Sequence, residues 1–89
     1  MERIWKYPLE IEDRHDYVMP AKSEILHVGE QNEKLYVWIR SIEDAPRTKR
    51  RIVIYGTGHQ IHNDNEKYVG TVIMSYGLVW HVYDAGEIN

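Results

Sequence analysis

The residues best suited to chemistry in this 89-residue chain lie in the segment YGTGHQIH, residues 55–62. The segment holds two of the chain's six glycines and two of its five histidines. Glycine-rich segments that follow a strand can bind phosphate through backbone N–H groups, and a His-x-x-His pair can contribute to a metal site. Two hypotheses therefore start here, a phosphate-binding loop and a metal site.

The phosphate-loop hypothesis fits the sequence only in part. Gly56, Thr57 and Gly58 end an apolar run, as such a loop does. No Lys-Ser/Thr pair follows, however, and no helical pattern begins after the glycines, so the segment is not a Walker or dinucleotide-binding loop. We expect a glycine-permitted bend through which the chain leaves a buried strand. The alternative is a ligand-facing loop that presents backbone N–H groups and the Thr57 hydroxyl.

Metal binding and catalysis have weaker support in the sequence. A zinc site needs three or four converging ligands, of which His59 and His62 would supply two and His81 or His27 a third. The chain has no cysteine, and its serines lie in no nucleophile motif. We therefore predict a protein without enzymatic activity, bound metal or cofactor. A metal-dependent hydrolase built on His59, His62 and His81 is the weakest of the functional hypotheses.

Charge and composition restrict the partners. Eleven Lys and Arg against 14 Asp and Glu give a formal net charge of -3, which argues against nucleic-acid binding by counterion release. The basic run RTKRR, residues 47–51, is either a solvated strand flank or a phosphate or carboxylate site. The lack of cysteine indicates a reducing compartment, and no segment resembles a signal peptide or a membrane span. We expect a cytoplasmic protein that binds no specific DNA or RNA and no membrane.

The elements that must position these residues are strands. Aromatic and β-branched runs recur roughly every 10 to 15 positions with turn formers between them, which is typical of an all-β sandwich or barrel. We expect a single antiparallel domain over residues 1–89, with about six to seven strands paired consecutively as a meander-type sandwich or open barrel and little or no helix. The expected strands are residues 4–10, 16–19, 24–28, 34–41, 50–56, 67–75 and 78–83. Gly77 and the stretch VGEQNEKLYVWI should each lie in a hairpin.

Alternate positions along these strands differ in character. The unbroken apolar runs LYVWI, IVIY and LVWHVY indicate a sheet covered on both faces. One parity is aliphatic, as a core usually is, whereas the other carries aromatic rings and guanidinium groups, as interfaces and planar-ligand sites do; the pattern alone does not decide which parity faces inward. The aliphatic set is Leu35, Val37, Ile39, Ile52 and Ile54, and the other set is Tyr36, Trp38, Arg40, Arg51 and Tyr55. Alternatively, the aromatic rings fill the interior of a small barrel and form neither an interface nor a ligand site.

Spare apolar surface predicts a homo-oligomer. Trp5 and Tyr7 precede Pro8, which confines the first strand to a sheet edge or to a turn soon after it. An edge strand that carries aromatic residues is a good docking surface for a second subunit.

Several segments in order resemble a family of small, uncharacterised proteins from bacteriophages and prophages. They are IWKYPLEI (4–11), MPAKSEILHV (19–28), LYVWI (35–39), DAPRTKRRIVIYGTGHQI (44–61), YVGTV (68–72) and LVWHVY (78–83). Relatives typically read W-K-Y-P-L, I-L-H-V, G-T-G-H-P-I, Y-x-G-T and V-W-H, and this chain has Gln60 where they usually have Pro. The resemblance covers nearly the whole chain and implies a phage origin but no particular chemistry. It singles out Gly56, Thr57, Gly58, His59, Trp80 and His81.

Small phage proteins without enzymatic motifs often act by binding. We therefore expect an anti-defence protein that sequesters a small nucleotide-like host immune signal. Arg51 and the Gly56–Gly58 backbone would hold the anionic part, and Trp38, Tyr55 or Trp80 would stack on a base. The expected ligand-binding residues are Arg51, Tyr55, Gly56, Thr57, Gly58, His59, Trp38, Trp80 and His81. The alternative is a direct inhibitor of a host defence or metabolic protein that acts through an aromatic sheet face or edge.

Overall fold

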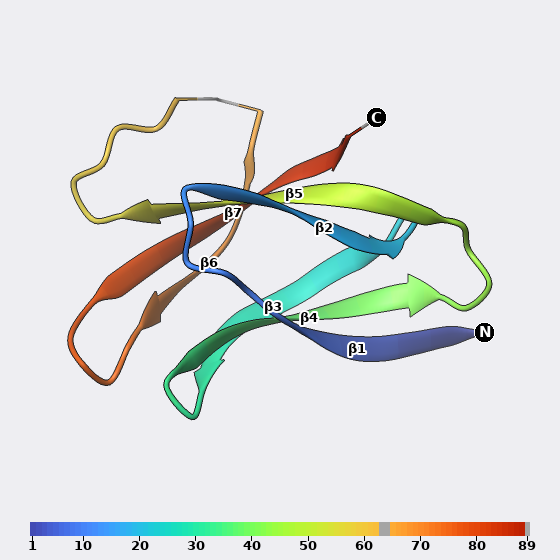
Figure 1. The fold of residues 1–89 in the computed structure, drawn as a ribbon, viewed down its shortest axis with the longest axis horizontal. Coiled ribbons are helices and arrows are strands. Elements are labelled where there is room, and N and C mark those ends of the chain that lie inside the picture. The colour runs from blue at the N-terminus through green and yellow to red at the C-terminus, as the bar shows by residue number, and fades with distance from the viewer. Residues whose placement is uncertain (63–64, 89) are drawn as a thin grey trace.

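The fold is described from a computed structural model, which defines residues 1–62 and 65–88. These residues form seven β-strands and no helix (Figure 1). The strands are β1 (Glu2–Pro8), β2 (Arg14–Pro20), β3 (Glu24–Gln31), β4 (Lys34–Ile42), β5 (Arg47–Gly56), β6 (Lys67–Ile73) and β7 (Val79–Ile88). The all-β class and the seven strands predicted from the sequence are confirmed, although the first strand ends at Pro8 and not at residue 10, and the last extends to Ile88 beyond its predicted end at residue 83. The described chain contains no helix long and apolar enough to cross a membrane.

The strands form two antiparallel sheets, ordered β1-β4-β3 and β2-β5-β7-β6, which do not close into a barrel (Figure 1). Both predicted hairpins are present, β3–β4 and β6–β7. Asn32 and Glu33 turn the first hairpin with φ of 53° and 65°, and Gly77 adopts a φ of 92° in the second. The other pairs, β1–β4, β2–β5 and β5–β7, join strands that are not consecutive. The expected run of consecutive pairs is therefore limited to the two hairpins.

The core lies between the sheets and consists of the aliphatic set. All five predicted members are buried, and Val37 and Ile39 are fully buried. Met19 and Val82 of the second sheet join them, with Met74 from the turn after β6. β3 and β6 bring the two sheets together, because a Cβ at Gly70 would lie only 2.9 Å from Val28 Cγ1. The aliphatic residues therefore form the core, which decides the question of parity that the sequence pattern left open.

The two sheets differ on their outer faces. On β4, the alternate residues Tyr36 and Trp38 are half-buried. On β5, Val53 and Tyr55 are buried, at 4 % and 7 % exposure, although they alternate with core residues. The predicted covering of both faces therefore holds at the end of β5, where the segment after the strand lies against the sheet.

A buried ion pair links β5 to β7 at the basic run, and its arginine also reaches the residue before β3 of the other sheet. Arg50 Nη2 and Nε donate to the two carboxylate oxygens of Asp84 at 2.6 and 2.9 Å, and Arg50 Nη1 donates to the carbonyl of Ser23 at 2.7 Å. The Gly86 N–H also donates to Asp84, at 2.8 Å. Hydrogen bonding to Asp84 raises the pKa of Arg50. Arg50 therefore anchors the start of β3 to β5 and β7, which is a structural role.

Candidate functional site

β5 ends in a tight turn over Gly56–His59. The His59 N–H donates to the Gly56 carbonyl at 3.1 Å, and Gly58 has a φ of 93°, which the third residue of a type II turn requires. The Gly56 N–H donates to His59 Nδ1 at 3.2 Å, so the neutral ring carries its hydrogen on Nε2. The predicted glycine-permitted bend is confirmed.

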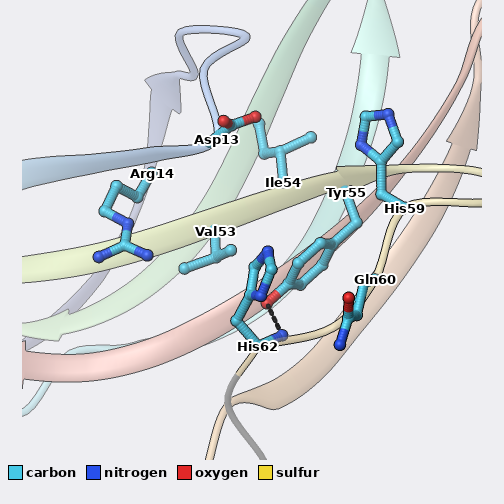
Figure 2. Close-up of a pocket in the computed structure, with 8 residues that line it drawn as sticks. All are labelled: Asp13, Arg14, Val53, Ile54, Tyr55, His59, Gln60 and His62. Atoms are coloured by element: carbon cyan, nitrogen blue, oxygen red, sulfur yellow. Dashed lines mark hydrogen bonds between the residues drawn. The ribbon is translucent and has the colours of Figure 1, made fainter.

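Tyr55 ties the segment after this turn to the sheet. Its hydroxyl donates to Glu66 Oε1 at 2.6 Å and accepts a longer hydrogen bond from the His62 N–H at 3.5 Å (Figure 2). Burial, followed by the hydrogen bond to Glu66, raises the pKa of Tyr55. The phenol therefore stays neutral and keeps its donor role.

A pocket of about 360 Å³ lies between this segment and the start of β2. Arg14 lies on β2, and His59, Gln60 and His62 lie on the segment after β5 (Figure 2). The lining residues are Asp13, Arg14, Val53, Ile54, Tyr55, His59, Gln60 and His62. Within residues 1–62 and 65–88, no carboxylate forms an ion pair with Arg14. A guanidinium in this position can donate two parallel hydrogen bonds to an anion.

A second pocket, of about 230 Å³, adjoins the first and shares Tyr55 and His59 with it. Its lining residues are Tyr55, Gly56, Thr57, Gly58, His59, Ile61, His81 and Tyr83. Both nitrogens of the His81 ring are within hydrogen-bond distance of threonine hydroxyls, Nε2 at 2.8 Å from Thr57 Oγ1 and Nδ1 at 3.0 Å from Thr71 Oγ1. The strand pairing of β6 with β7 and the Gly56–His59 turn thus hold this imidazole from two sides.

Three tyrosines form a row beside His81. The Tyr83 ring makes edge contacts with Tyr55 and Tyr68, each at a centroid distance of 5.4 Å. The Tyr68 hydroxyl lies 2.6 Å from Thr71 Oγ1, which extends the hydrogen-bonded chain from His81. The outer face of this sheet therefore combines aromatic surface with hydroxyl groups.

Six of the nine predicted site residues line the second pocket together. They are Tyr55, Gly56, Thr57, Gly58, His59 and His81. Trp80 precedes His81 in the same strand, so it lies on the opposite face, where it packs against the core. Its indole Nε1 is buried and has no hydrogen-bond partner among the described residues.

The remaining two predicted residues lie elsewhere. Trp38 belongs to the other sheet, where its ring contacts His27 and Tyr36 at centroid distances of 5.9 and 6.3 Å. Arg51 donates to Asp16 at 2.8 and 3.2 Å, which lowers the pKa of that carboxyl and raises the pKa of the guanidinium. Neither residue lines the two pockets at the turn.

Sequence reasoning missed Arg14. Nothing in the local sequence around this residue indicates a site, because its partner strand is 39 positions away in the register pair Arg14↔Val53. Only the antiparallel pairing of β2 with β5 brings it opposite the turn.

The three histidines of the metal hypothesis do not gather. His59 and His62 line the first pocket, while His81 lines only the second. In the described part of the chain, no group of three or more His, Cys, Asp or Glu side chains could hold a metal ion.

The family model described as "Domain of unknown function (DUF7352)" matches residues 1–88. No curated protein and no solved structure matches the chain. The match spans every strand and both pockets, so the turn and the row of tyrosines lie within the family's domain. The chain is therefore a member of the DUF7352 family.

Proposed function

We propose that this protein is a non-enzymatic binding protein that holds a small, anionic, nucleotide-like ligand in the pocket between Arg14 and the Gly56–His59 turn. The observation that carries the proposal is the Arg14 guanidinium, which lines a pocket with two imidazoles and an amide and has no ion-pair partner among the described residues. Arg14 takes the role that we expected of Arg51, because Asp16 already occupies the Arg51 guanidinium.

The donors around the pocket match the parts of a nucleotide. Arg14 and the Nε2–H of His59 would bind phosphate oxygens, since both are hydrogen-bond donors. Asp13 is the one carboxylate among the described lining residues, and a carboxylate accepts hydrogen bonds from ribose hydroxyls. Gln60 has both a donor and an acceptor for a base edge. The pocket volume of about 360 Å³ lies within the usual range for small-ligand sites.

Isothermal titration calorimetry with linear, cyclic and dinucleotide ligands tests this proposal. We expect at least one of them to bind, and we expect Arg14→Gln to weaken it by tenfold or more, which is about 1.4 kcal/mol. Arg51→Gln is the matched control, because it removes a guanidinium of the same sheet outside the pocket. The absence of binding by every nucleotide, or an equal effect of the two variants, would contradict the proposal.

We propose sequestration of a host immune signal in the bacterial cytoplasm as the cellular role. The support is the resemblance of the W-K-Y-P-L, G-T-G-H and V-W-H segments to phage proteins. Sequestration differs from degradation in one measurable way. After the protein is denatured by heat, the nucleotide should be recovered intact and in full. Recovery of a hydrolysed product would instead favour the metal-dependent hydrolase.

A second candidate function is direct inhibition of a host protein through the outer face of the β1-β4-β3 sheet. Trp38 and Tyr36 are half-buried there, and Lys6 Nζ lies 4.5 Å from the Tyr36 ring centre. Tryptophan and tyrosine are enriched among residues that dominate binding energy at interfaces. This function predicts a complex with a host protein that Trp38→Ala abolishes and Arg14→Gln leaves intact.

A further inference from the structure

Strand β1 has a free edge that carries apolar side chains. Among the described residues it pairs only with β4, and it lies along one border of the molecule (Figure 1). Ile4 and Trp5 are 65 % and 51 % exposed. The β1–β4 register contains no bulge, and Pro8 lies at the end of the strand. An edge without bulges or an internal proline is a template for pairing with another strand.

The backbone groups that face this edge can be identified. At the two ends of the strand, the Met1 carbonyl accepts a hydrogen bond across the β4 side at 2.7 Å, and the Leu9 N–H donates one at 2.9 Å. Residues of an antiparallel pair alternate between bonding to their neighbour and pointing away from it. The odd-numbered residues of β1 therefore bond to β4. The N–H and C=O groups of Glu2, Ile4 and Lys6 point to the open edge.

We propose that β1 pairs in antiparallel fashion with β1 of a second copy of this chain, with the two Ile4 residues opposite each other on a twofold axis. In this register Glu2 of each copy faces Lys6 of the other, so every outward N–H and C=O of these three residues finds a partner. Arg3 of each copy faces Trp5 of the other, which places a guanidinium beside an exposed indole. The pairing joins apolar to apolar and acid to base.

Other registers of the β1–β1 pairing leave more backbone groups of this edge without a hydrogen-bond partner. Residues with outward backbone groups must meet each other, so the register can shift only in steps of two. One shift places Glu2 opposite Pro8, which has no N–H to donate. The opposite shift sets Ile4 against Glu2 and leaves Lys6 beyond the end of the pairing. The Ile4 register is thus the one that uses the whole edge.

Of the other edge strands, β3 and β6 lie against each other, and β2 is less suited than β1 to pairing with itself. The Asp13 carbonyl and the Ala21 N–H bond to the β5 side, so the even-numbered residues of β2 point outward. A twofold axis at Asp16 would bring two carboxylates together, and like charges directly opposite each other are destabilising. An axis at Val18 would place Asp16 opposite Pro20, which lacks a donor.

The surface area of the chain also favours a partner. A 10.6-kDa monomer is expected to expose about 5,500 Å². This chain exposes 6,032 Å² and is only 16 Å thick along its shortest axis. Pairing through β1 would merge two three-stranded sheets into one continuous sheet and cover Ile4 and Trp5.

Sedimentation velocity over a concentration series tests the proposed dimer. We expect the unmodified chain to form a dimer that Ile4→Lys converts to a monomer, because two ammonium groups would then meet on the axis. Val18→Lys is the matched control, since Val18 is 56 % exposed on β2, an edge strand of the second sheet. It should leave the dimer unchanged. A chain that stays monomeric at about 200 µM, or a dimer that survives Ile4→Lys, overturns the proposal.

Charge reversal tests the register itself. Glu2→Lys and Lys6→Glu each place like charges opposite each other, so each should raise the dimer dissociation constant by about tenfold. The double variant restores opposite charges and should return the constant to within about threefold of the original. Equal weakening in the double variant would exclude this register. In hydrogen exchange, the Ile4 and Lys6 amides should gain protection on dimerisation, independently of whether nucleotides bind.

Discussion

The His59 ring lies directly against Gly56, in the space that a side chain at Gly56 would occupy. A Cβ there would be 3.1 Å from His59 Cε1, and the Gly56 N–H donates to His59 Nδ1. Gly58, two residues later, has open space around its Cα but a φ of 93°. The two glycines of the turn are therefore required for different reasons, one for room and the other for backbone conformation.

Two alanine variants separate these roles. Gly58→Ala should lower the free energy of unfolding by about 1 kcal/mol, because a side chain strains this conformation. Its His59 ring signals in NMR spectra should stay in place. Gly56→Ala should shift those signals, because the ring must move by a few tenths of an ångström. His59 signals that shift in Gly58→Ala and not in Gly56→Ala would contradict the assignment.

The tie between Tyr55 and the following segment can be tested by removing one oxygen. Tyr55→Phe deletes the hydroxyl that bonds to Glu66 and should lower the free energy of unfolding by about 1–2 kcal/mol. The amide of His62 loses its acceptor, so its hydrogen exchange should accelerate. Tyr83→Phe is the control, because the described structure gives that hydroxyl no such bond to Glu66. Equal effects of the two variants would contradict a stabilising role for the hydrogen bonds of the Tyr55 hydroxyl.

The buried Arg50–Asp84 pair should respond strongly to loss of one partner. Asp84→Ala leaves a buried guanidinium without its carboxylate and should cost about 3–5 kcal/mol in denaturant unfolding. The double variant Arg50→Met with Asp84→Leu removes both charges and should be less destabilised than Asp84→Ala alone. Asp16→Ala, at the more exposed Arg51 pair, should have a much smaller effect. A double variant that is worse than Asp84→Ala would contradict this ranking.

These pairs also show what could be predicted from the sequence. The strands, the split of their residues into an aliphatic and an aromatic set, and the turn at Gly58 follow from local patterns, since each depends on neighbouring residues. The sequence does not show which of Arg50 and Arg51 is buried, because the two residues are adjacent and differ only in the face of β5 on which each lies. Their partners, Asp84 and Asp16, come from strands far away in the sequence. Arg14 was missed for the same reason, since long-range pairing places it at the pocket.

Acid should destabilise the fold through Asp16 and Glu87. Hydrogen bonding to Arg51 lowers the pKa of Asp16, and the Lys22 N–H followed by the Thr48 hydroxyl lowers the pKa of Glu87. A carboxyl with a lower pKa in the folded state contributes stability above its unfolded pKa. That contribution is lost as pH falls through the folded value. The free energy of unfolding should therefore decrease below about pH 4.

Denaturant melts of Asp16→Asn between pH 2 and pH 7 check this dependence. The variant should be less stable than the original chain at neutral pH and should lose less stability on acidification, because its side chain no longer titrates. Glu87→Gln should behave in the same way. Parallel pH curves for the original chain and Asp16→Asn would show that the Arg51 pair contributes nothing to acid sensitivity.

The contact between Gly70 and Val28 sets how closely the two sheets approach. Gly70 lies on β6 and Val28 on β3, and a Cβ at Gly70 would lie 2.9 Å from Val28 Cγ1, closer than real contacts allow. Val28 is 3 % exposed, and its branched side chain has little freedom to rotate away. Gly70→Ala should therefore lower the free energy of unfolding by about 1–3 kcal/mol.

A double-mutant cycle distinguishes this clash from a general preference for glycine in the strand. Val28→Ala removes the methyl group that a Cβ at Gly70 would meet, at the cost of a cavity. The double variant Gly70→Ala with Val28→Ala should be more stable than the sum of the single effects predicts, by about 1 kcal/mol or more. Strict additivity would mean that the cost of Gly70→Ala arises within β6. Coupling would mean that the close approach of β3 and β6 requires the glycine.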